Sequence, residues 1–410
     1  MRFLHAADIH LDSPLQGLER YPGAPLEALR GATRRALVNL VELALAESVE
    51  LLLIAGDLYD GDWRDYNTGL FFITQMQRLR AAGIPVCLIA GNHDAASQIT
   101  RVLRLPDNVH VFATDRPETR VFDSLGLAVH GQGFATRAVT TDLSRNYPPP
   151  VAGLFNIGLL HTALEGRSGH ARYAPCRLEA LRQHGYDYWA LGHVHTREVL
   201  AEAPWVVFPG NLQGRHIREC GAKGATLVTF DHDHRVSLQH RALDVVRWAR
   251  VEVALDGCDD LDVVHARIDQ ALARTGEQAE GRTLALRLEL TGTTGLDAQL
   301  RAEYEHLVNE CRGLAGAHGH RLWLEQVRVE TRPEGQTVVA DAALGGLLEA
   351  IERLELDPST LAEDLEPLAT RLPSAVRQGG GDPTDPQLLR ACLEDVRALL
   401  RARLLGTEQR

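Results

Sequence analysis

Five short polar clusters, each directly after a strand-like apolar run, constrain the fold of this chain more than any other feature. The apolar runs are Phe3–Ala7, Leu51–Ala55, Val86–Ala90, Ile157–Leu160 and Tyr188–Leu191. The clusters that follow them are Asp8-Ile9-His10, Gly56-Asp57, Gly91-Asn92-His93-Asp94, His161 and Gly192-His193-Val194-His195. Most of the intervening segments are long enough for a crossover helix, which predicts an open α/β sheet. Because such sheets bind ligands beyond the carboxyl ends of their strands, we expect all five clusters at one edge.

The chain has 410 residues, which indicates two or three domains. Residues 1–245 alternate short strands with helices and are predicted to form an α/β layered domain that carries the polar clusters. Residues 246–331 follow a β-α-β-α-β order, which predicts a small separate α+β domain. Residues 340–410 are mostly helical, and the amphipathic last helix is predicted either to pack on its own domain or to dock on a partner.

Composition indicates where this chain works. It is 45% apolar and 24% charged, as in soluble globular proteins. No stretch approaches the roughly 18 to 20 uninterrupted apolar residues of a membrane span, and the N-terminus runs into a strand without a signal-like region. We therefore expect no membrane association and a cytoplasmic location. A net charge of -12 argues against broad electrostatic wrapping of nucleic acid, although a metal centre and a few arginines can still hold phosphate locally.

The polar clusters contain the side chains that bind hard and borderline metal ions. Asp8 and His10 are two residues apart, so on an extended chain they project to the same side. Asp57 has two carboxylate oxygens and can bridge two cations. We expect one cation on Asp8, His10, Asp57 and His195, and a second on Asp57, Asn92, His161 and His193. Mixed oxygen and nitrogen ligands suit manganese or iron, with zinc as a further option.

Such a pair of ions predicts a hydrolytic reaction on phosphate. Two cations about 3.5 to 4 Å apart would hold a bridging hydroxide for in-line attack on phosphorus. His93 has no ligand role in this assignment and is predicted to protonate the leaving sugar oxygen. Asp94 is predicted to accept a hydrogen bond from His93 and keep it cationic.

Asp-x-His, Gly-Asp, Gly-Asn-His-Asp, a lone His and Gly-His-x-His, in this order, resemble the calcineurin-like metallophosphoesterase superfamily. Within it, residues 5–15, 56–60 and 209–216 are similar to the SbcD/YhaO type of DNA repair exonuclease. The resemblance implies a layered β-sandwich core flanked by helices, a capping domain and a helical partner-binding segment. It also implies a manganese-dependent nuclease that acts on DNA ends with an SMC-like coiled-coil ATPase, and a homodimer.

Three positions are less closely defined by the resemblance. Asp60 stands where some archaeal relatives have a second histidine, so a two-histidine catalytic arrangement is not assumed and the role of Asp60 is left open. Arg215 and His216 are predicted to contact the DNA backbone.

Two other functions remain open at this stage. The same metal centre could hydrolyse small phosphodiesters or phosphoproteins, or the chain could be a DNA-end scaffold without catalysis. The additional residues after the first domain favour DNA, because a small substrate does not require them. The intact set of ligand types favours catalysis over a scaffold.

Overall fold

The computed structural model describes residues 1–13, 25–60, 66–96, 104–164, 173–319 and 321–334, and towards the C-terminus residues 351, 357–372, 382–390, 392–393, 396–397 and 400. It contains two compact units, of which the first ends at Trp248 and the second begins at Ala249. The predicted boundary after residue 245 falls at the start of strand β13 (Val246–Ala254). Each unit is described by itself below.

The first sheet of unit one has six strands in the order β12-β11-β1-β2-β3-β4. Strands β1 to β4 are mutually parallel, whereas β11 runs antiparallel to both of its neighbours. The strands are β1 (Arg2–Ala6), β2 (Leu51–Ile54), β3 (Val86–Leu88), β4 (Val109–Val111), β11 (Gly224–Phe230) and β12 (Val236–Ala242). Three of the five predicted runs therefore lie side by side, in parallel, as β1, β2 and β3.

The second sheet also has six strands, in the order β5-β6-β7-β8-β10-β9. Its four central strands are parallel, and the two edge strands are antiparallel to their neighbours. The strands are β5 (Glu118–Phe122), β6 (Leu127–Gly131), β7 (Phe155–His161), β8 (Tyr188–Gly192), β9 (Glu198–Glu202) and β10 (Trp205–Phe208). The remaining two predicted runs are the neighbouring strands β7 and β8.

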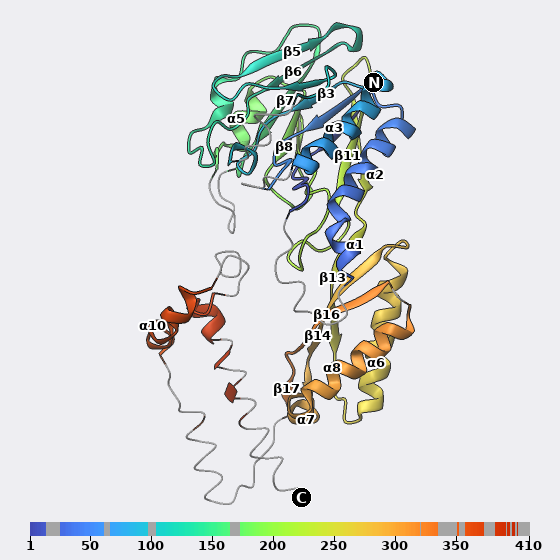
Figure 1. Cartoon of the computed structure of the whole chain (residues 1–410), viewed down its shortest axis with the longest axis vertical. Helices are drawn as coiled ribbons and strands as arrows, with labels where there is room; N and C mark the ends of the chain where they lie inside the picture. The colour runs from blue at the N-terminus through green and yellow to red at the C-terminus, as the bar shows by residue number, and fades with distance from the viewer. Residues whose placement is uncertain are drawn as a thin grey trace, which may run out of the picture. The chain divides into compact units, whose positions relative to one another are not determined.

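The two sheets pack face to face, with helices on their outer faces. Alternate side chains of β1 and β2, such as Phe3 and Leu53, pack against Ile157 and other residues of the second sheet. The opposite set, such as Leu4 and Ile54, packs against side chains of α2 (Ala32–Ala46) and α3 (Tyr66–Ala81). Figure 1 shows these two helices beside the first sheet. Strands buried on both faces have continuous apolar sequences, as these strands do.

Short helices complete this unit. They are α1 (Leu26–Arg30), α5 (Leu178–Gln183) and the 3-10 turns η2 (Asp94–Ala96), η3 (Asp123–Leu125) and η4 (Leu143–Asn146). Leu181 of α5 packs on the outer face of the second sheet, where its carbonyl accepts a hydrogen bond from the Trp189 indole at 3.0 Å. The predicted α/β fold, a layered β-sandwich flanked by helices, is confirmed.

A buried histidine joins the two sheets close to their carboxyl ends. His5 of β1 donates from Nε2 to the carbonyl of Leu191 on β8 at 3.1 Å. Its Nδ1 then accepts from the Tyr188 hydroxyl at 3.0 Å. Burial lowers the pKa of His5 to about 3, so the ring stays neutral and both nitrogens keep these roles.

Unit two begins with a three-stranded sheet in the order β13-β14-β16. Its elements are α6 (Leu261–Glu277), β14 (Thr283–Thr291), α7 (Asp297–Ala302), α8 (Tyr304–Ala317) and β16 (Leu322–Val329), with a small pair formed by β15 (Thr293–Thr294) and β17 (Arg332–Pro333). Val264, Ile268 and Cys311 of the helices pack on one face of this sheet. The three sheet strands and the helical connections between them follow the predicted β-α-β-α-β order, except that the second connection contains two helices, α7 and α8, and that β15 and β17 form an additional pair.

The predicted helical segment 340–410 falls largely outside the described residues. Its described part contains α10 (Pro358–Ala369) and helical residues between 386 and 400. Asp357 caps α10 by accepting from the Ser359 amide at 3.1 Å. Among the helices in the described ranges, none is both long and apolar enough to cross a membrane.

Candidate metal centre

The polar clusters converge at the carboxyl ends of β1, β2, β3, β7 and β8. The Asp8 amide donates to the Gly56 carbonyl at 3.0 Å, and the His10 amide donates to the Asp57 carbonyl at 3.0 Å. The backbone amide of His193 donates to both carboxylate oxygens of Asp8, at 3.1 and 3.0 Å. These bonds fix the loops of both sheets against each other.

Four of the expected ligands have a positive backbone φ angle: His193, with φ 103°, and three residues that lie in the left-handed helical region at the ends of β1 and β2. The φ angles are 51° at Asp8, 45° at His10 and 50° at Asp57. Residues with a Cβ adopt this region at a cost of about 1 to 3 kcal/mol each, and such strained residues cluster at functional sites. The turns direct all three side chains into the space between the strand ends.

Two glycines before the ligands permit the close approach of the loops. A Cβ at Gly192 would lie 1.9 Å from the Ala55 carbonyl oxygen, and one at Gly91 would lie 2.2 Å from an Asp57 carboxylate oxygen. Both distances are too short for any side chain. Steric crowding therefore explains why the patterns Gly-His-x-His and Gly-Asn-His-Asp each begin with glycine.

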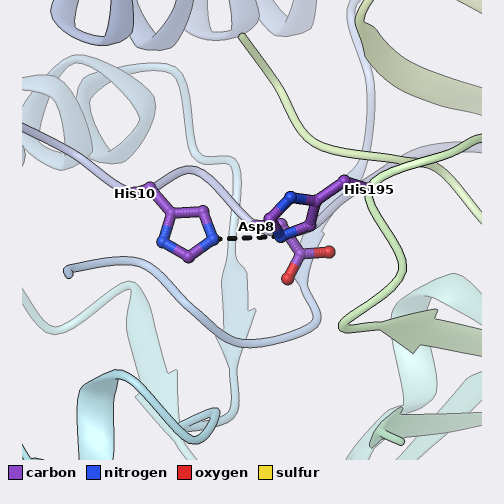
Figure 2. Close-up of side chains that lie close together, drawn as sticks. All are labelled: Asp8, His10 and His195. Atoms are coloured by element: carbon purple, nitrogen blue, oxygen red, sulfur yellow. Dashed lines mark hydrogen bonds between the residues drawn. The ribbon is translucent and has the colours of Figure 1, made fainter. Parts of the chain in front are cut away.

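Asp8, His10 and His195 form the first group of potential ligands, with donor atoms within 4.8 Å of one another (Figure 2). Nε2 of His10 lies 3.2 Å from Nε2 of His195, and the Asp8 carboxylate lies beside the His195 ring. His195 donates from Nδ1 to Glu219 at 2.6 Å, so its Nε2 presents a lone pair to the site.

Asp57, His161 and His193 form the second group. His161 donates from Nδ1 to the Ala55 carbonyl at 2.8 Å, which directs Nε2 into the site. This Nε2 lies 3.0 Å from Oδ1 of Asn92 and 3.5 Å from Oδ2 of Asp57. Nδ1 of His193 lies 3.2 Å from the same Asn92 oxygen.

The charges of the second group favour a positive charge between these atoms. Burial lowers the pKa of His161, but Asp57, Asp8 and its hydrogen bonds outweigh burial and raise it to about 9. Burial by itself raises the pKa of Asp57, but the charges and hydrogen bonds of His161 and His93 outweigh burial and hold this pKa below its ordinary range. A carboxylate, an amide oxygen and imidazole nitrogens that converge in this way match the donor set of a divalent transition metal. The residues therefore fit a bound cation, and the two groups together could hold two.

His93 is paired with a carboxylate other than the predicted one. Its Nδ1 donates to Oδ1 of Asp60 at 2.6 Å. Burial lowers the pKa of His93, but the hydrogen bond to Asp60 and the charge of Asp57 outweigh burial and raise the pKa above its usual value. The His93 side chain is 30% exposed, whereas those of His10 and His161 are buried, so solvent reaches this ring.

The prediction that Asp94 accepts the hydrogen bond from His93 is therefore wrong. Asp94 lies in η2, where the turn directs its carboxylate at backbone amides. It accepts from Leu58 at 3.1 Å, from Tyr59 at 2.8 Å and from Gly91 at 3.0 Å. Asp94 thus fixes the loops after β2 and β3, while Asp60, whose role was open, orients His93.

The predicted DNA contacts, Arg215 and His216, lie beside the first group. The Arg215 side chain is 14% exposed and forms ion pairs with Asp60 and Glu219, both at 3.3 Å. His216 is 54% exposed, and its Nε2 lies 3.7 Å from Glu219. A contact of either residue with DNA stays a prediction.

Two further residues support His195 and were missed in the sequence. Glu219 accepts a hydrogen bond from Nδ1 of His195, and Nζ of Lys223 donates to the backbone carbonyl of His195 at 2.8 Å. Lys223 is 6% exposed and is the only lysine of the chain, which otherwise carries its basic charge on arginine. This single lysine was the feature of the sequence that could have drawn attention to Lys223, because lysine and arginine are not interchangeable where a side chain makes a specific contact.

Two family models match this chain. The calcineurin-like phosphoesterase model matches residues 1–197, and the middle domain of metallophosphoesterase YhaO matches residues 248–332. A curated relative, the uncharacterized metallophosphoesterase YhaO of Bacillus subtilis, is 33% identical over 380 residues, which cover 89% of this chain and 90% of that protein. The chain belongs to the calcineurin-like metallophosphoesterases. The resemblance inferred from the motifs is confirmed.

Other relatives, which align with a smaller share of this metallophosphoesterase, carry names that specify DNA repair or a nuclease. The DNA double-strand break repair protein Mre11 of Methanopyrus kandleri is 27% identical over 61% of this chain and 58% of its own length. One component of the nuclease SbcCD of Rhodobacter capsulatus is 34% identical over 28% of this chain and 27% of its own length. The chain spans little more than half of the first protein and about a quarter of the second.

Cation binding should release a proton from the metallophosphoesterase. Because the pKa of His161 is about 9, this ring is protonated at pH 7.5 and must lose its Nε2 proton to bind a cation. Affinity for Mn²⁺ should therefore rise with pH towards 9. Calorimetric titration at pH 7.5 in two buffers of different ionisation enthalpy measures the release. Equal heats in both buffers would contradict the assignment, and His161→Ala is the control that removes the proton.

Replacement of Asp94 should affect folding rather than proton donation. Asp94→Ala leaves three buried amides without their acceptor, so the free energy of unfolding in EDTA should fall by at least about 1 to 3 kcal/mol. Asp94→Asn retains one acceptor oxygen and should lose less. Denaturant unfolding measures both variants. Unchanged stability of Asp94→Ala would contradict this structural role of the carboxylate.

Proposed function

We propose that this metallophosphoesterase is a metal-dependent DNA phosphodiesterase, an exonuclease with endonuclease activity as a further option, that works in DNA repair with an SMC-like ATPase. The observation that carries the proposal is a solvent-accessible His93, hydrogen-bonded to Asp60, beside two groups of potential metal-binding side chains. The ring of His93 lies 4.9 Å from that of His10, which belongs to the first group. This arrangement suits cleavage of a phosphodiester with a poor leaving group.

The proposed ligands are Asp8, His10, Asp57 and His195 for one cation, and Asp57, Asn92, His161 and His193 for the other. When bound, two divalent cations, of which Mn²⁺ suits this donor set, would activate water and neutralise charge on the phosphate. Asp57 is the proposed bridging residue, since it has two carboxylate oxygens. Its Oδ1 also accepts from the His93 amide at 2.9 Å, which fixes its orientation.

His93 is the proposed proton donor to the leaving oxygen. Asp60 accepts a hydrogen bond from its Nδ1–H group, which leaves the Nε2 proton for the substrate. Burial raises the pKa of Asp60, but the hydrogen bond from His93 and the charge of Arg215 outweigh burial and lower it to about 2. Asp60 is therefore an anion at neutral pH and favours the cationic form of His93.

The choice of DNA over a small phosphodiester or a phosphoprotein depends on two kinds of support. Relatives named as a DNA double-strand break repair protein and as part of a nuclease align with this chain at 27% and 34% identity. The second unit, with its own hydrophobic core, exceeds what a small substrate requires. We likewise propose a cytoplasmic location, a homodimer, the capping role of residues 246–331 and partner binding by residues 340–410.

The function is tested with Mn²⁺ and three substrates: linear duplex DNA, single-stranded DNA and a chromogenic phosphodiester. The wild-type chain should degrade DNA, and His93→Ala should lower turnover about 10²- to 10⁴-fold because the general acid is lost. The metal content of His93→Ala should equal that of the wild type, which elemental analysis measures. Loss of metal would make His93 a ligand. Hydrolysis of the chromogenic ester alone, with the ATPase present, would favour the small-phosphodiester alternative.

The partner role of the C-terminal segment has its own test. Deletion of residues 340–410 should leave hydrolysis of the chromogenic ester intact, because none of the proposed site residues lies there. It should abolish co-elution with the purified SMC-like ATPase in size-exclusion chromatography. Co-elution of the truncated chain would exclude this segment as the docking element.

A further inference from the structure

We propose that Arg215 is a positioning residue. Through two carboxylates it fixes the orientation of His195, from the first ligand group, relative to the proton donor His93. This inference rests on the proposed function, because it assigns Arg215 to the same reaction. It replaces the contact with the DNA backbone that the sequence predicts for this arginine.

The guanidinium of Arg215 reaches two carboxylates at once. Nη1 lies 3.3 Å from Oδ2 of Asp60, and Nη2 lies 3.3 Å from Oε1 of Glu219. Nη1 also donates to the Ser13 hydroxyl at 3.2 Å, and this hydroxyl donates to the same Asp60 oxygen at 2.5 Å. Segments that are far apart in the sequence therefore meet at the Arg215 guanidinium.

Each of these carboxylates holds one functional histidine. Glu219 accepts from Nδ1 of His195 at 2.6 Å, and Asp60 accepts from Nδ1 of His93 at 2.6 Å. The contacts run without a gap from His195 through Glu219, Arg215 and Asp60 to His93. A shift of the guanidinium would thus move the carboxylates that orient both rings.

The segment around Arg215 is itself fixed to Glu219. The backbone amide of Arg215 donates to Oε2 of Glu219 at 2.7 Å, and Asn211 donates to the same oxygen at 3.0 Å. The Glu219 side chain is 5% exposed, so a neutralising partner is required for its charge. Arg215 supplies that charge while its backbone limits where the side chain can lie.

Arginine suits this task better than lysine. Its planar guanidinium presents two terminal nitrogens in a fixed geometry and can bind two carboxylates in different directions, whereas an ammonium group is a single point charge. Arg215→Lys retains the charge but should reach only one carboxylate at a time. Arg215→Met retains most of the apolar stem and removes the charge.

Two measurements on the full-length protein separate positioning from substrate binding. Mn²⁺ affinity, measured by calorimetry without substrate, reports the His195 side of the network. The kcat and KM for the chromogenic phosphodiester at saturating Mn²⁺ report the His93 side. Arg215→Met should lower both Mn²⁺ affinity and kcat about 10-fold, the lower end of the effect of losing a group bonded directly to a metal ligand, because Arg215 acts on His195 through Glu219. KM should stay within about threefold, because no substrate contact is removed.

Arg215→Lys should give intermediate losses and keeps the inference testable if Arg215→Met does not fold. Arg235→Met is the matched control, since Arg235 is 79% exposed and pairs with Asp233 in the turn between β11 and β12. It should leave both measurements unchanged. In the Glu219→Gln background, Arg215→Met should cost little further Mn²⁺ affinity, because the two residues act through the same contact.

Three outcomes would overturn the inference. A raised KM with unchanged kcat and Mn²⁺ affinity would make Arg215 a substrate ligand. Lowered thermal stability with normal Mn²⁺ affinity and kcat would make its role purely structural. Full additivity with Glu219→Gln would exclude a shared contact. If the wild type hydrolyses neither DNA nor the ester, the proposed function fails, but the Mn²⁺ measurements still decide whether Arg215 positions His195.

Discussion

The hydrogen bond from His161 to the Ala55 carbonyl, at 2.8 Å, is the contact on which the rest of the site depends. It joins the end of β7 in the second sheet to the end of β2 in the first. The bond also fixes the tautomer, so that Nε2 faces Asp57 and Asn92. Gly56 and Gly192 lie against this contact, and a Cβ on either would collide with His161 or Ala55. The two sheet edges can therefore lie this close because His161 supplies a hydrogen-bond donor at the end of β7 and because Gly56 and Gly192 have no side chains beside it.

The functional histidines are arranged in layers around this junction. His161 and His10 are buried and have pKa shifts of opposite sign. The carboxylates raise the pKa of His161, whereas burial and the charge of Arg215 lower that of His10. His93 and His195 lie further out, with side chains 30% and 24% exposed, and each donates to a carboxylate. Solvent is thus kept from His10 and His161, whereas a substrate can reach His93 and the neighbouring proposed ligand His195.

Carboxylates that accept hydrogen bonds from backbone amides have a different role around the site from carboxylates that accept from side chains. Asp94 binds three amides and holds two loops together, although it stands next to His93 in the sequence. Asp60 is 33 positions away from His93 and yet is its partner. Neighbouring residues in a tight turn direct their side chains apart, so adjacency along the chain indicated the wrong carboxylate. The same turn explains why Asp94 could not be assigned from its motif alone.

The sequence by itself determined the α/β class, the five strand ends and, through its motifs, the family, because apolar runs and short motifs are local properties. The single open sheet expected from the strand spacing is instead two sheets packed face to face, with β1, β2 and β3 in one and β7 and β8 in the other. The sequence also defined the ligand types, since Asp, His and Asn follow strands at fixed spacings. Only the tertiary structure decided the partners of those residues. Asp60, Glu219 and Lys223 meet the site from loops whose paths depend on how two sheets pack, and no short-range pattern specifies that packing. Arg215 is the clearest case, because its residue type suggested a phosphate ligand and its position gave it two carboxylates.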